Sequence, residues 1–184
     1  IITHCHPDHI GGLMENGTPL FPNARYIIGE VEYAFWSAPE RLSGPTEAAA
    51  KLTQANIVPL KEKMAFVKDG HEAASGIRAI EAFGHTPGHL AWHVESSGER
   101  LLLGADFCNH FVLSLTKPDW HVLFDTDKEQ AAKTRNRLLD MIATDKIPFT
   151  SYHMPFPAVG FVEKSADGAY RYVPATYQFT LERS

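Results

Sequence analysis

The sequence lacks the positive charge that binding to nucleic acid requires. Among 184 residues, 17 Lys and Arg stand against 22 Asp and Glu, and the formal net charge is -5. The sequence contains no basic run and no stripe of basic and aromatic residues, whereas proteins that bind nucleic acid concentrate positive charge on one face. We therefore expect no nucleic-acid partner.

Long apolar runs and paired cysteines are also missing. No stretch approaches the roughly 20 apolar residues of a membrane-spanning helix, so we expect no membrane span. The two cysteines, Cys5 and Cys108, are too few for a disulfide framework, and neither belongs to a CxxC pair. Cys5 lies between two histidines and is open to a role as a zinc ligand. The histidines are the better candidates, and we expect Cys5 to be a small buried thiol.

The secondary structure expected from the sequence alternates between strands and helices. With 44% hydrophobic residues, the chain is long enough to fold around one core. The expected strands are 1–3, 24–29, 64–70, 76–84, a hairpin over 89–106, 147–153, and a pair over 161–165 and 170–174. The expected helices are a short one after His9, then 30–37, 46–55 and 126–144, the last opened by a capping box of Thr126 and Glu129. This mixture predicts an α/β or α+β fold built in layers.

The densest group of chemically active residues is the segment THCHPDH at residues 3–9. In an extended chain, residues two apart point the same way, so His4 and His6 can approach one metal ion together. Pro7 then turns the chain, and Asp8 and His9 can address a second metal ion nearby. Imidazole and carboxylate are ligands of zinc, and also of manganese, iron or cobalt. A surface loop rich in histidine is the plain alternative, which the preceding apolar strand disfavours.

Four ligands do not complete two metal sites, and three later residues lie where expected strands end. They are His85 in FGHTPGH, Asp106 in LLLGAD and His153 in FTSYHMPFP. Loops held by rigid strands are where functional groups concentrate. Each residue alone has an ordinary structural explanation, but together with the opening motif the three complete two sites.

The motifs THCHPDH, GHTPGH, GAD and YH, in this order, resemble those of the metallo-β-lactamase superfamily of dinuclear metal hydrolases. The resemblance covers nearly the whole chain and implies a four-layer αββα sandwich with two divalent metal ions, foremost Zn²⁺. It implies His4, His6 and His85 as ligands of one metal, Asp8, His9 and His153 as ligands of the other, and Asp106 as the bridge between them. Asp8 and Asp106 would also act in catalysis, Asp8 by orienting the nucleophile and Asp106 by fixing the spacing of the metals. His89 is expected to support or pack against the site.

Within the superfamily, the chain looks most like the branch of methyl parathion hydrolase and the quorum-quenching lactonases. Asp106 differs from the cysteine or serine of many true β-lactamases. Acyl-homoserine lactonases carry a tyrosine three residues after the bridging aspartate, where this chain has Asn109. The resemblance to the methyl parathion hydrolase branch therefore rests on the spacing of the motifs, the helix before the last histidine and the segment YHMPFPAVGFV.

Three aromatic residues are the expected substrate pocket. Trp36 matches an aromatic that lines the leaving-group pocket of that branch, and a position in the core is an equal alternative. Phe107 and Phe111 flank Asp106 in the sequence. Together they would favour an aryl group stacked on the rings.

The resemblance implies a hydrolase that uses a metal-bridging hydroxide on neutral esters, lactones or aryl phosphotriesters. Residues 3–13, 83–91 and 104–115 contain no Lys or Arg, so an anionic substrate would lack a cationic partner there. The alternatives are an acyl-homoserine lactonase or another hydrolase of the same fold, and a non-catalytic fragment.

In the superfamily, the first sheet builds up before the histidine-rich motif, which here begins at residue 4. We therefore expect residues 1–184 to be a single metallo-β-lactamase-type domain that is truncated at its N-terminus and folds poorly in isolation. The localisation, cytoplasmic or exported, stays open. The expected partner is a small ester-like substrate, and a homodimer is left open.

Overall fold

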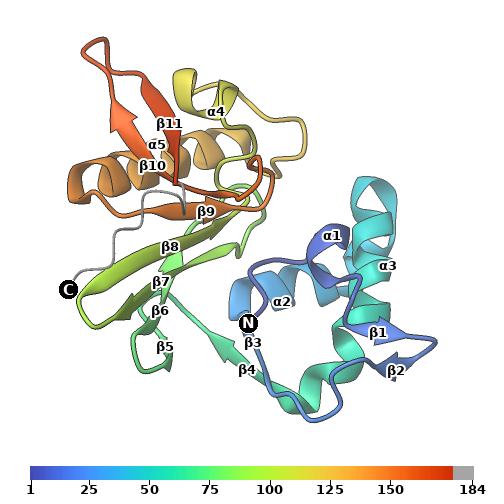
Figure 1. Cartoon of the computed structure of the whole chain (residues 1–184). Coiled ribbons are helices and arrows are strands. Elements are labelled where there is room, and N and C mark those ends of the chain that lie inside the picture. Colours follow the sequence, from blue (N-terminus) through green and yellow to red (C-terminus); the bar gives the residue numbers. More distant parts are fainter. Residues whose placement is uncertain (176–184) are drawn as a thin grey trace.

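A seven-stranded sheet forms the centre of the molecule in the computed structural model, which describes residues 1–175 (Figure 1). Its strands are β5 (Glu72–Ala74), β6 (Ile77–Glu81), β7 (Leu90–Ser96), β8 (Glu99–Ala105), β9 (Phe149–Ser151), β10 (Val159–Lys164) and β11 (Tyr170–Pro174). The order is β11-β10-β9-β8-β7-β6-β5, with β8 and β9 parallel and the other neighbours antiparallel. The hairpins β7–β8 and β10–β11 confirm two sequence predictions, while the short strand β5 was not predicted.

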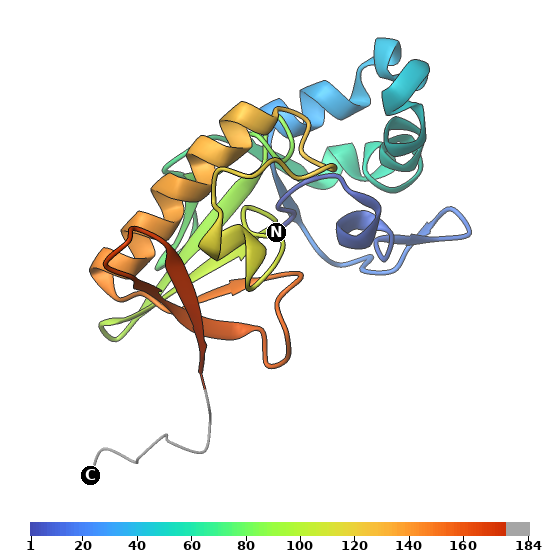
Figure 2. The same ribbon diagram turned by 90° about the horizontal axis from the view of Figure 1, so that it is seen from above.

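Helix α5 (Lys128–Asp145) runs along one face of this sheet (Figure 2). Its buried residues include Leu138, Leu139 and Ile142, which pack with Leu102 and Phe149 of the sheet. These apolar residues recur at helical spacing, so one stripe of the helix is removed from water.

The predicted start of α5 is wrong by one residue. Its N-cap is Asp127, whose side chain accepts a hydrogen bond of 2.9 Å from the Gln130 N–H. Thr126 instead belongs to the preceding loop, because its own N–H donates to the His85 carbonyl at 3.0 Å.

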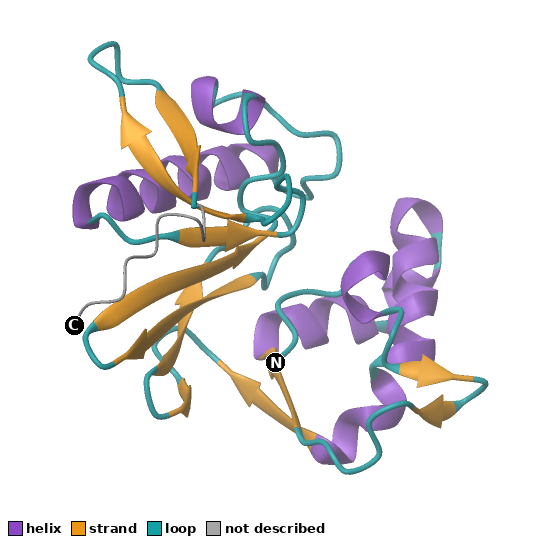
Figure 3. Ribbon diagram, viewed as in Figure 1, coloured by secondary structure: helices purple, strands orange, loops and turns teal. Residues whose placement is uncertain are grey.

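A smaller parallel pair, β3 (Tyr26–Gly29) with β4 (Met64–Val67), covers part of the other face of the sheet. Val67 packs there against Leu90 and Trp92 of β7. On its far side the pair contacts α2 (Glu30–Ser37) and α3 (Glu47–Asn56) through a second core. Figure 3 shows these helices gathered on the side of the molecule away from α5. The order is therefore helix, sheet, sheet, helix, which confirms the expected αββα layers.

The N-terminal segment joins the two sheets without forming a strand of its own. Ile2 donates to the Ile27 carbonyl of β3 at 2.8 Å, and the Thr3 carbonyl accepts from Leu90 of β7 at 3.1 Å. The strand predicted at residues 1–3 is thus wrong as an assigned element, because these single bonds on either side make no ladder. The segment nevertheless carries the histidine motif to the junction of the two sheets.

Short elements complete the described chain. They are α1 (Pro7–Ile10), β1 (Met14–Glu15), β2 (Thr18–Pro19), η1 (Pro39–Leu42), η2 (Gly44–Thr46), η3 (Val58–Lys63) and α4 (Leu113–Thr116). The short helix predicted after His9 begins earlier, at Pro7, because proline is already set in the φ of a helix's first position. Among the described residues, no helix is both long and apolar enough to cross a membrane.

Candidate metal centre

Five segments bring the candidate ligands to one edge of the central sheet. His4 and His6 lie on the entering segment, while Asp8 and His9 belong to α1. The remaining ligands follow strands: His85 lies in the loop after β6, Asp106 directly follows β8, and His153 follows β9. Strand ends therefore place residues that are far apart in the sequence side by side.

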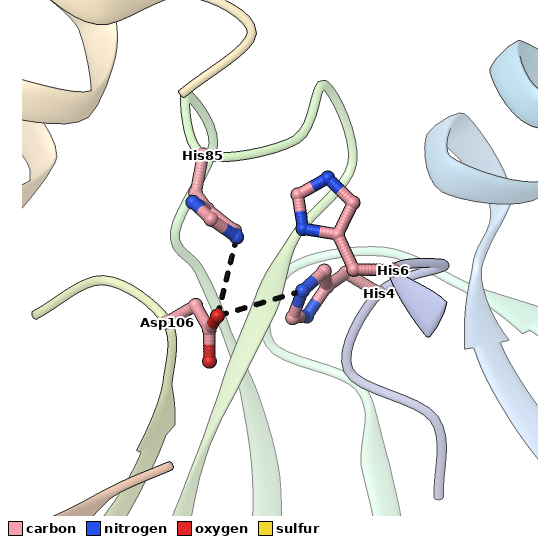
Figure 4. Close-up of side chains that lie close together, drawn as sticks. All are labelled: His4, His6, His85 and Asp106. Carbon is pink, nitrogen blue, oxygen red and sulfur yellow. Dashed lines mark ion pairs between the residues drawn. The ribbon is translucent and has the colours of Figure 1, made fainter. Parts of the chain in front are cut away.

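The first group consists of His4, His6, His85 and Asp106, whose ligand atoms all lie within 4.8 Å of one another. Figure 4 shows the three imidazoles and the carboxylate facing a common space. Asp106 Oδ2 lies 3.3 Å from His85 Nε2 and 3.9 Å from His4 Nε2. This arrangement can hold one metal ion with nitrogen and oxygen ligands.

The second group consists of Asp8, His9, His153 and again Asp106, within the same limit of 4.8 Å. Asp106 Oδ1 lies 3.2 Å from His9 Nε2, and Asp106 Oδ2 lies 3.1 Å from His153 Nε2. Asp8 Oδ2 lies 3.5 Å from His9 and 3.6 Å from His153. The carboxylate of Asp106 is thus common to both groups, and both groups are the sets that the sequence motifs predicted.

Several of these atoms are buried without a hydrogen-bond partner. Within residues 1–175 they include Nε2 of His4, His9 and His85, and Oδ1 of Asp106. Their mutual distances are short, but the angles do not make hydrogen bonds between them. Buried polar atoms are normally paired, because leaving them unpaired is costly. Divalent metal ions fit this set of converging lone pairs, since imidazole nitrogen and carboxylate oxygen are ligands that such ions take.

The imidazoles on the inner side of the site are held neutral. Burial lowers the pKa of His4 well below its ordinary value, and the neighbouring histidines lower it further. Burial, followed by the charge on His85, lowers the pKa of His6 to about 4. A neutral imidazole has a free lone pair, which is the form that binds metal.

Asp106 and His85 are shifted the other way, toward their charged forms. Burial alone would raise the pKa of Asp106, but the close imidazoles of His85, His9 and His4 hold it well below the usual range. Burial would likewise lower the pKa of His85, yet Asp106 and Asp125 raise it to about 9. Asp106 is therefore ionised at neutral pH, the form in which a carboxylate can bind a metal ion.

Three supporting residues were not predicted from the sequence as parts of the site. Glu32 of α2 is fully buried and accepts hydrogen bonds from the Cys5 N–H (2.8 Å), the Thr86 hydroxyl (2.7 Å) and the Gly88 N–H (2.9 Å). It therefore ties the loop of His4 and His6 to the loop of His85. In the sequence it reads as an ordinary charged residue of an amphipathic helix, and no motif marks it.

The other two are Asp125 and Arg135, which lie behind His85. Asp125 accepts from His85 Nδ1 at 2.9 Å and pairs with Arg135 Nη2 at 3.0 Å. The residue pair is buried, and its members come from a loop and from α5. The one available signal was the position of Asp125 just before the helix start, which a solvent-exposed loop would explain as well.

His89 packs behind the site, as predicted. It is fully buried, and its Nε2 accepts a hydrogen bond of 3.2 Å from the backbone N–H of Asp106. Burial lowers the pKa of His89 to about 3, so the ring is neutral and can accept this bond. It belongs to neither ligand group.

A cavity of about 380 Å³ opens onto the ligands. Its lining is His6, Pro7, Asp8, His85, Asp106, Asn109, Phe124 and His153. A second cavity of about 410 Å³ adjoins it, shares Asn109, Phe124 and His153, and adds Leu113, Trp120 and Val122 together with polar residues that include Lys117. The ligands thus face a space that continues into a largely apolar pocket.

The three predicted pocket aromatics line neither cavity. Phe107 is 2% exposed and packs against Phe149 in the core, under Gly104, where a Cβ atom would lie 2.3 Å from its ring. Trp36 is 4% exposed and belongs to the second core, with its ring centroid 6.2 Å from that of His6. Phe111 stacks on His110 at the surface. Their role as substrate contacts therefore stays a prediction, Trp36 takes the core position that was the alternative for it, and Phe124 is the aromatic residue that lines both cavities.

The αββα layers and the two ligand groups that share Asp106 define a protein of the metallo-β-lactamase type. The sequence model of the metallo-β-lactamase superfamily matches residues 1–146, and the chain belongs to that superfamily. The comparison with curated proteins gives no match.

Solved structures of the same fold include two with substantial similarity. The hydrolase AbOPH of the β-lactamase superfamily is 25% identical, with a TM-score of 0.86 over 95% of this chain and 63% of its own. The dizinc quorum-quenching lactonase AidC, in complex with a product, N-hexanoyl-L-homoserine, is 29% identical, with a TM-score of 0.83 over the same shares. A probable metal-dependent hydrolase from Staphylococcus aureus is 23% identical and shares the fold, with a TM-score of 0.74 over 95% of this chain and 61% of its own. The chain spans about 63% of the length of the first two proteins.

Proposed function

We propose that this protein is a metal-dependent hydrolase of neutral esters, lactones or aryl phosphotriesters, with a dinuclear centre at Asp106. The observation that carries the proposal is the shared carboxylate: one buried, ionised aspartate lies between two groups of ligand atoms, several of which are buried without a hydrogen-bond partner. His4, His6 and His85 would hold one metal ion, and Asp8, His9 and His153 the other. Family membership and the fold of the hydrolases AbOPH and AidC support this assignment.

Bound there, the two ions would supply Lewis-acid activation of a water molecule and of the substrate's carbonyl or phosphoryl oxygen. The chain itself contributes charge and position. Asp106 is fixed by the hydrogen bond from its N–H to His89, so its carboxylate keeps one place between the two groups. Asp8 is 42% exposed on its side chain and lines the cavity, so it can accept a proton there and pass it to a leaving group.

The charged side chains around the two cavities favour neutral substrates. None of the described residues that line the inner cavity is Lys or Arg. Lys117 lines the adjoining cavity, but its side chain is exposed to water. The apolar residues of that lining are Leu113, Trp120, Val122 and Phe124. An anionic group that extends past the metal ions into the cavities would thus meet no buried cationic side chain, and its burial there would be costly.

A lactonase is the second candidate, and one observation favours it. AidC, whose structure holds a ring-opened acyl-homoserine, has the higher sequence identity of the two similar structures, at 29%. The adjoining apolar cavity of about 410 Å³ would accept an acyl chain in the same way as an aryl group. The two candidates therefore differ in substrate and share the same site.

Metal content and a matched substrate panel test the proposal. We expect about two divalent ions per chain by elemental analysis, and faster hydrolysis of dialkyl aryl phosphates, aryl esters or acyl-homoserine lactones than of the corresponding phosphodiesters. The control is His71→Ala, which changes an exposed histidine away from the site and should keep both metals. Active protein without metal, or a clear preference for the anionic substrates, would contradict the proposal.

A further inference from the structure

We propose that Arg135 of α5, acting through Asp125, is a positioning residue that holds His85 and Asp106 in register for metal binding. The inference rests on the proposed metal centre and concerns residues that contact no metal or substrate themselves. The buried guanidinium of Arg135 hydrogen-bonds to Asp125, which itself contacts His85. It also hydrogen-bonds to the carbonyl of Phe107, the residue after Asp106.

Arg135 is unusual for a charged residue of a helix because it is only 1% exposed. Its Nη2 donates to Asp125 at 3.0 Å and its Nε to the Phe107 carbonyl at 3.2 Å. Its Nη1 donates to the carbonyls of Pro118 at 2.6 Å and Trp120 at 3.0 Å. The side chain thus uses four donors in fixed directions, which the planar fork of arginine offers and the single ammonium of lysine does not.

The first branch leads to His85. The carboxylate of Asp125 is fully buried, with one oxygen on Arg135 and the other on His85 Nδ1 at 2.9 Å. Because Nδ1 donates to a carboxylate, loss of the second ring proton on metal binding would leave the lone pair of His85 on Nε2, the atom that faces Asp106. A carboxylate behind a ligating histidine fixes its tautomer and ring orientation in this way. Arg135 in turn holds the carboxylate.

The second branch leads to Asp106. Phe107, whose carbonyl accepts from Arg135, is the next residue in the chain. Ala105, the residue before, has a φ of 50°, so the chain turns sharply as it leaves β8. The hydrogen bond from Arg135 to the Phe107 carbonyl fixes the chain directly after this turn. The hydrogen bond from the Asp106 N–H to His89 fixes the turn itself.

The guanidinium joins these two branches, in addition to the bond from the Asp106 N–H to His89 in the loop of His85. His85 is in the loop after β6 and Asp106 follows β8, and their facing atoms are 3.3 Å apart. The bonds to Pro118 and Trp120 fix the loop that walls the adjoining cavity as well. If Arg135 only stabilised the fold, the ion pair with Asp125 would be enough to neutralise its charge. Its other hydrogen bonds go to the loop after Asp106 and to the loop that lines the adjoining cavity.

Arg135→Lys is the sharpest test, because it keeps the charge and the pairing with Asp125 but loses the fork. The matched control is Arg137→Lys on the same helix, whose exposed side chain donates to the Glu81 carbonyl away from the site. Zinc affinity is measured by competition with a chromophoric chelator, and ligand geometry by the visible absorption spectrum of the cobalt-substituted protein. We expect Arg135→Lys to weaken zinc binding by about 10–100-fold, the range found for residues behind metal ligands, and to shift the cobalt bands. Arg137→Lys should change neither.

A second variant covers the case in which Arg135→Lys does not fold. Asp125→Asn with Arg135→Gln removes both charges together, so no unpaired charge remains buried. We expect this double variant to show the same loss of zinc affinity with a shifted cobalt spectrum. Wild-type affinity and spectrum in either folded variant would overturn the proposal. Loss of structure in both variants at saturating zinc would overturn it too, because Arg135 would then act on the fold as a whole.

The result for the unchanged protein separates this inference from the proposed function. If the wild-type chain binds no metal, the proposed function fails. If it binds two metal ions and the variants bind them equally well, only the role of Arg135 fails.

Discussion

Glu32 accepts a hydrogen bond of 2.8 Å from the backbone N–H of Cys5, the residue between His4 and His6. Its other oxygen accepts from Thr86 and Gly88 on the opposite loop. A single carboxylate on α2 thus joins the two segments that carry the three histidines of the first group. Burial raises the pKa of Glu32, and these hydrogen bonds oppose that rise.

Glu32→Gln should destabilise the protein although it changes size very little. The new amide NH₂ cannot accept, so Cys5 or the pair Thr86 and Gly88 loses its acceptor in a buried place. We expect a loss of about 1–3 kcal/mol in the free energy of unfolding, measured with denaturant. Glu30→Gln on the same helix is the control, since its ion pair with Lys68 is exposed and should be worth less than about 1 kcal/mol. Equal effects of the two substitutions would contradict the role given to Glu32.

Substitution of the shared carboxylate should affect both metal ions, whereas substitution of a ligand from one group should affect one. Asp106→Asn removes the charge between the groups, and His153→Ala removes a ligand of the second group only. We expect elemental analysis to find a large loss of both metals in the first variant and a selective loss of one in the second. The drop in affinity should exceed the roughly 100-fold seen for residues outside the ligand shell. Loss of one metal in Asp106→Asn, with the other bound as before, would show that the carboxylate does not bridge.

Removal of metal should lower stability as well as activity. The unpaired atoms around Asp106 are buried, so ions that bind only the folded chain stabilise it by mass action. We expect the unfolding temperature to fall on treatment with a chelator and to return with added zinc, in a scanning calorimeter. An unchanged transition in protein shown to have lost its metal would argue against a built site.

The two thiols should report separately on the site and on the core. Cys5 and Cys108 are fully buried, and burial raises the pKa of both, that of Cys108 to about 12. A thiol reagent should therefore react slowly with either residue at pH 8, because the thiolate is the reacting form. On chelation we expect labelling of Cys5 to rise more than labelling of Cys108, because Cys5 sits between two candidate ligands. Mass spectrometry of labelled peptides measures both rates, and a rise at Cys108 alone would contradict the expectation.

The sequence predicted the parts of the fold and site that depend on local pattern. The helix at residues 30–37 and the hairpin β7–β8 follow from amphipathic spacing and a turn, and the structure confirms both. The seven candidate ligands came from the opening motif and from three later motifs at strand ends, and these segments meet at one edge of the central sheet. Their metal-binding roles stay predictions until metal is measured.

Local sequence patterns could not predict the supporting residues Glu32, Asp125 and Arg135. Glu32 is 27 residues from Cys5 and Asp125 is 40 residues from His85. The sequence does not show whether an Asp or Glu at such a distance is buried or exposed. The position of Phe107 depends on a similar feature. It neighbours Asp106 in the sequence, but the chain turns at Ala105 and sends the ring into the core, beneath Gly104. Nearness to Asp106 along the chain therefore does not show which aromatic residue lines the cavities.

The last prediction contrasts the aromatic that lines the site with one that was expected to. Phe124 is 72% exposed and lines both cavities, whereas Trp36 is 4% exposed and packs in the second core. Phe124→Ala should lower kcat/KM for aryl substrates by about 10-fold, or roughly 1.4 kcal/mol, with little change in unfolding free energy. Trp36→Ala should instead cost about 3–5 kcal/mol of stability, as large-to-small changes in a core do.

Matched aryl and methyl esters of one acid, assayed on both variants beside denaturant unfolding, separate the two effects. A methyl leaving group is too small to stack on the ring of Phe124. The substitution Phe124→Ala should therefore leave kcat/KM for the methyl ester unchanged. If that variant slows both esters equally, Phe124 acts on the ligands and not on the aryl group. If Trp36→Ala is as stable as the wild type and loses activity on aryl esters alone, the tryptophan contacts substrate after all, and the assignment of the pocket to Phe124 is wrong.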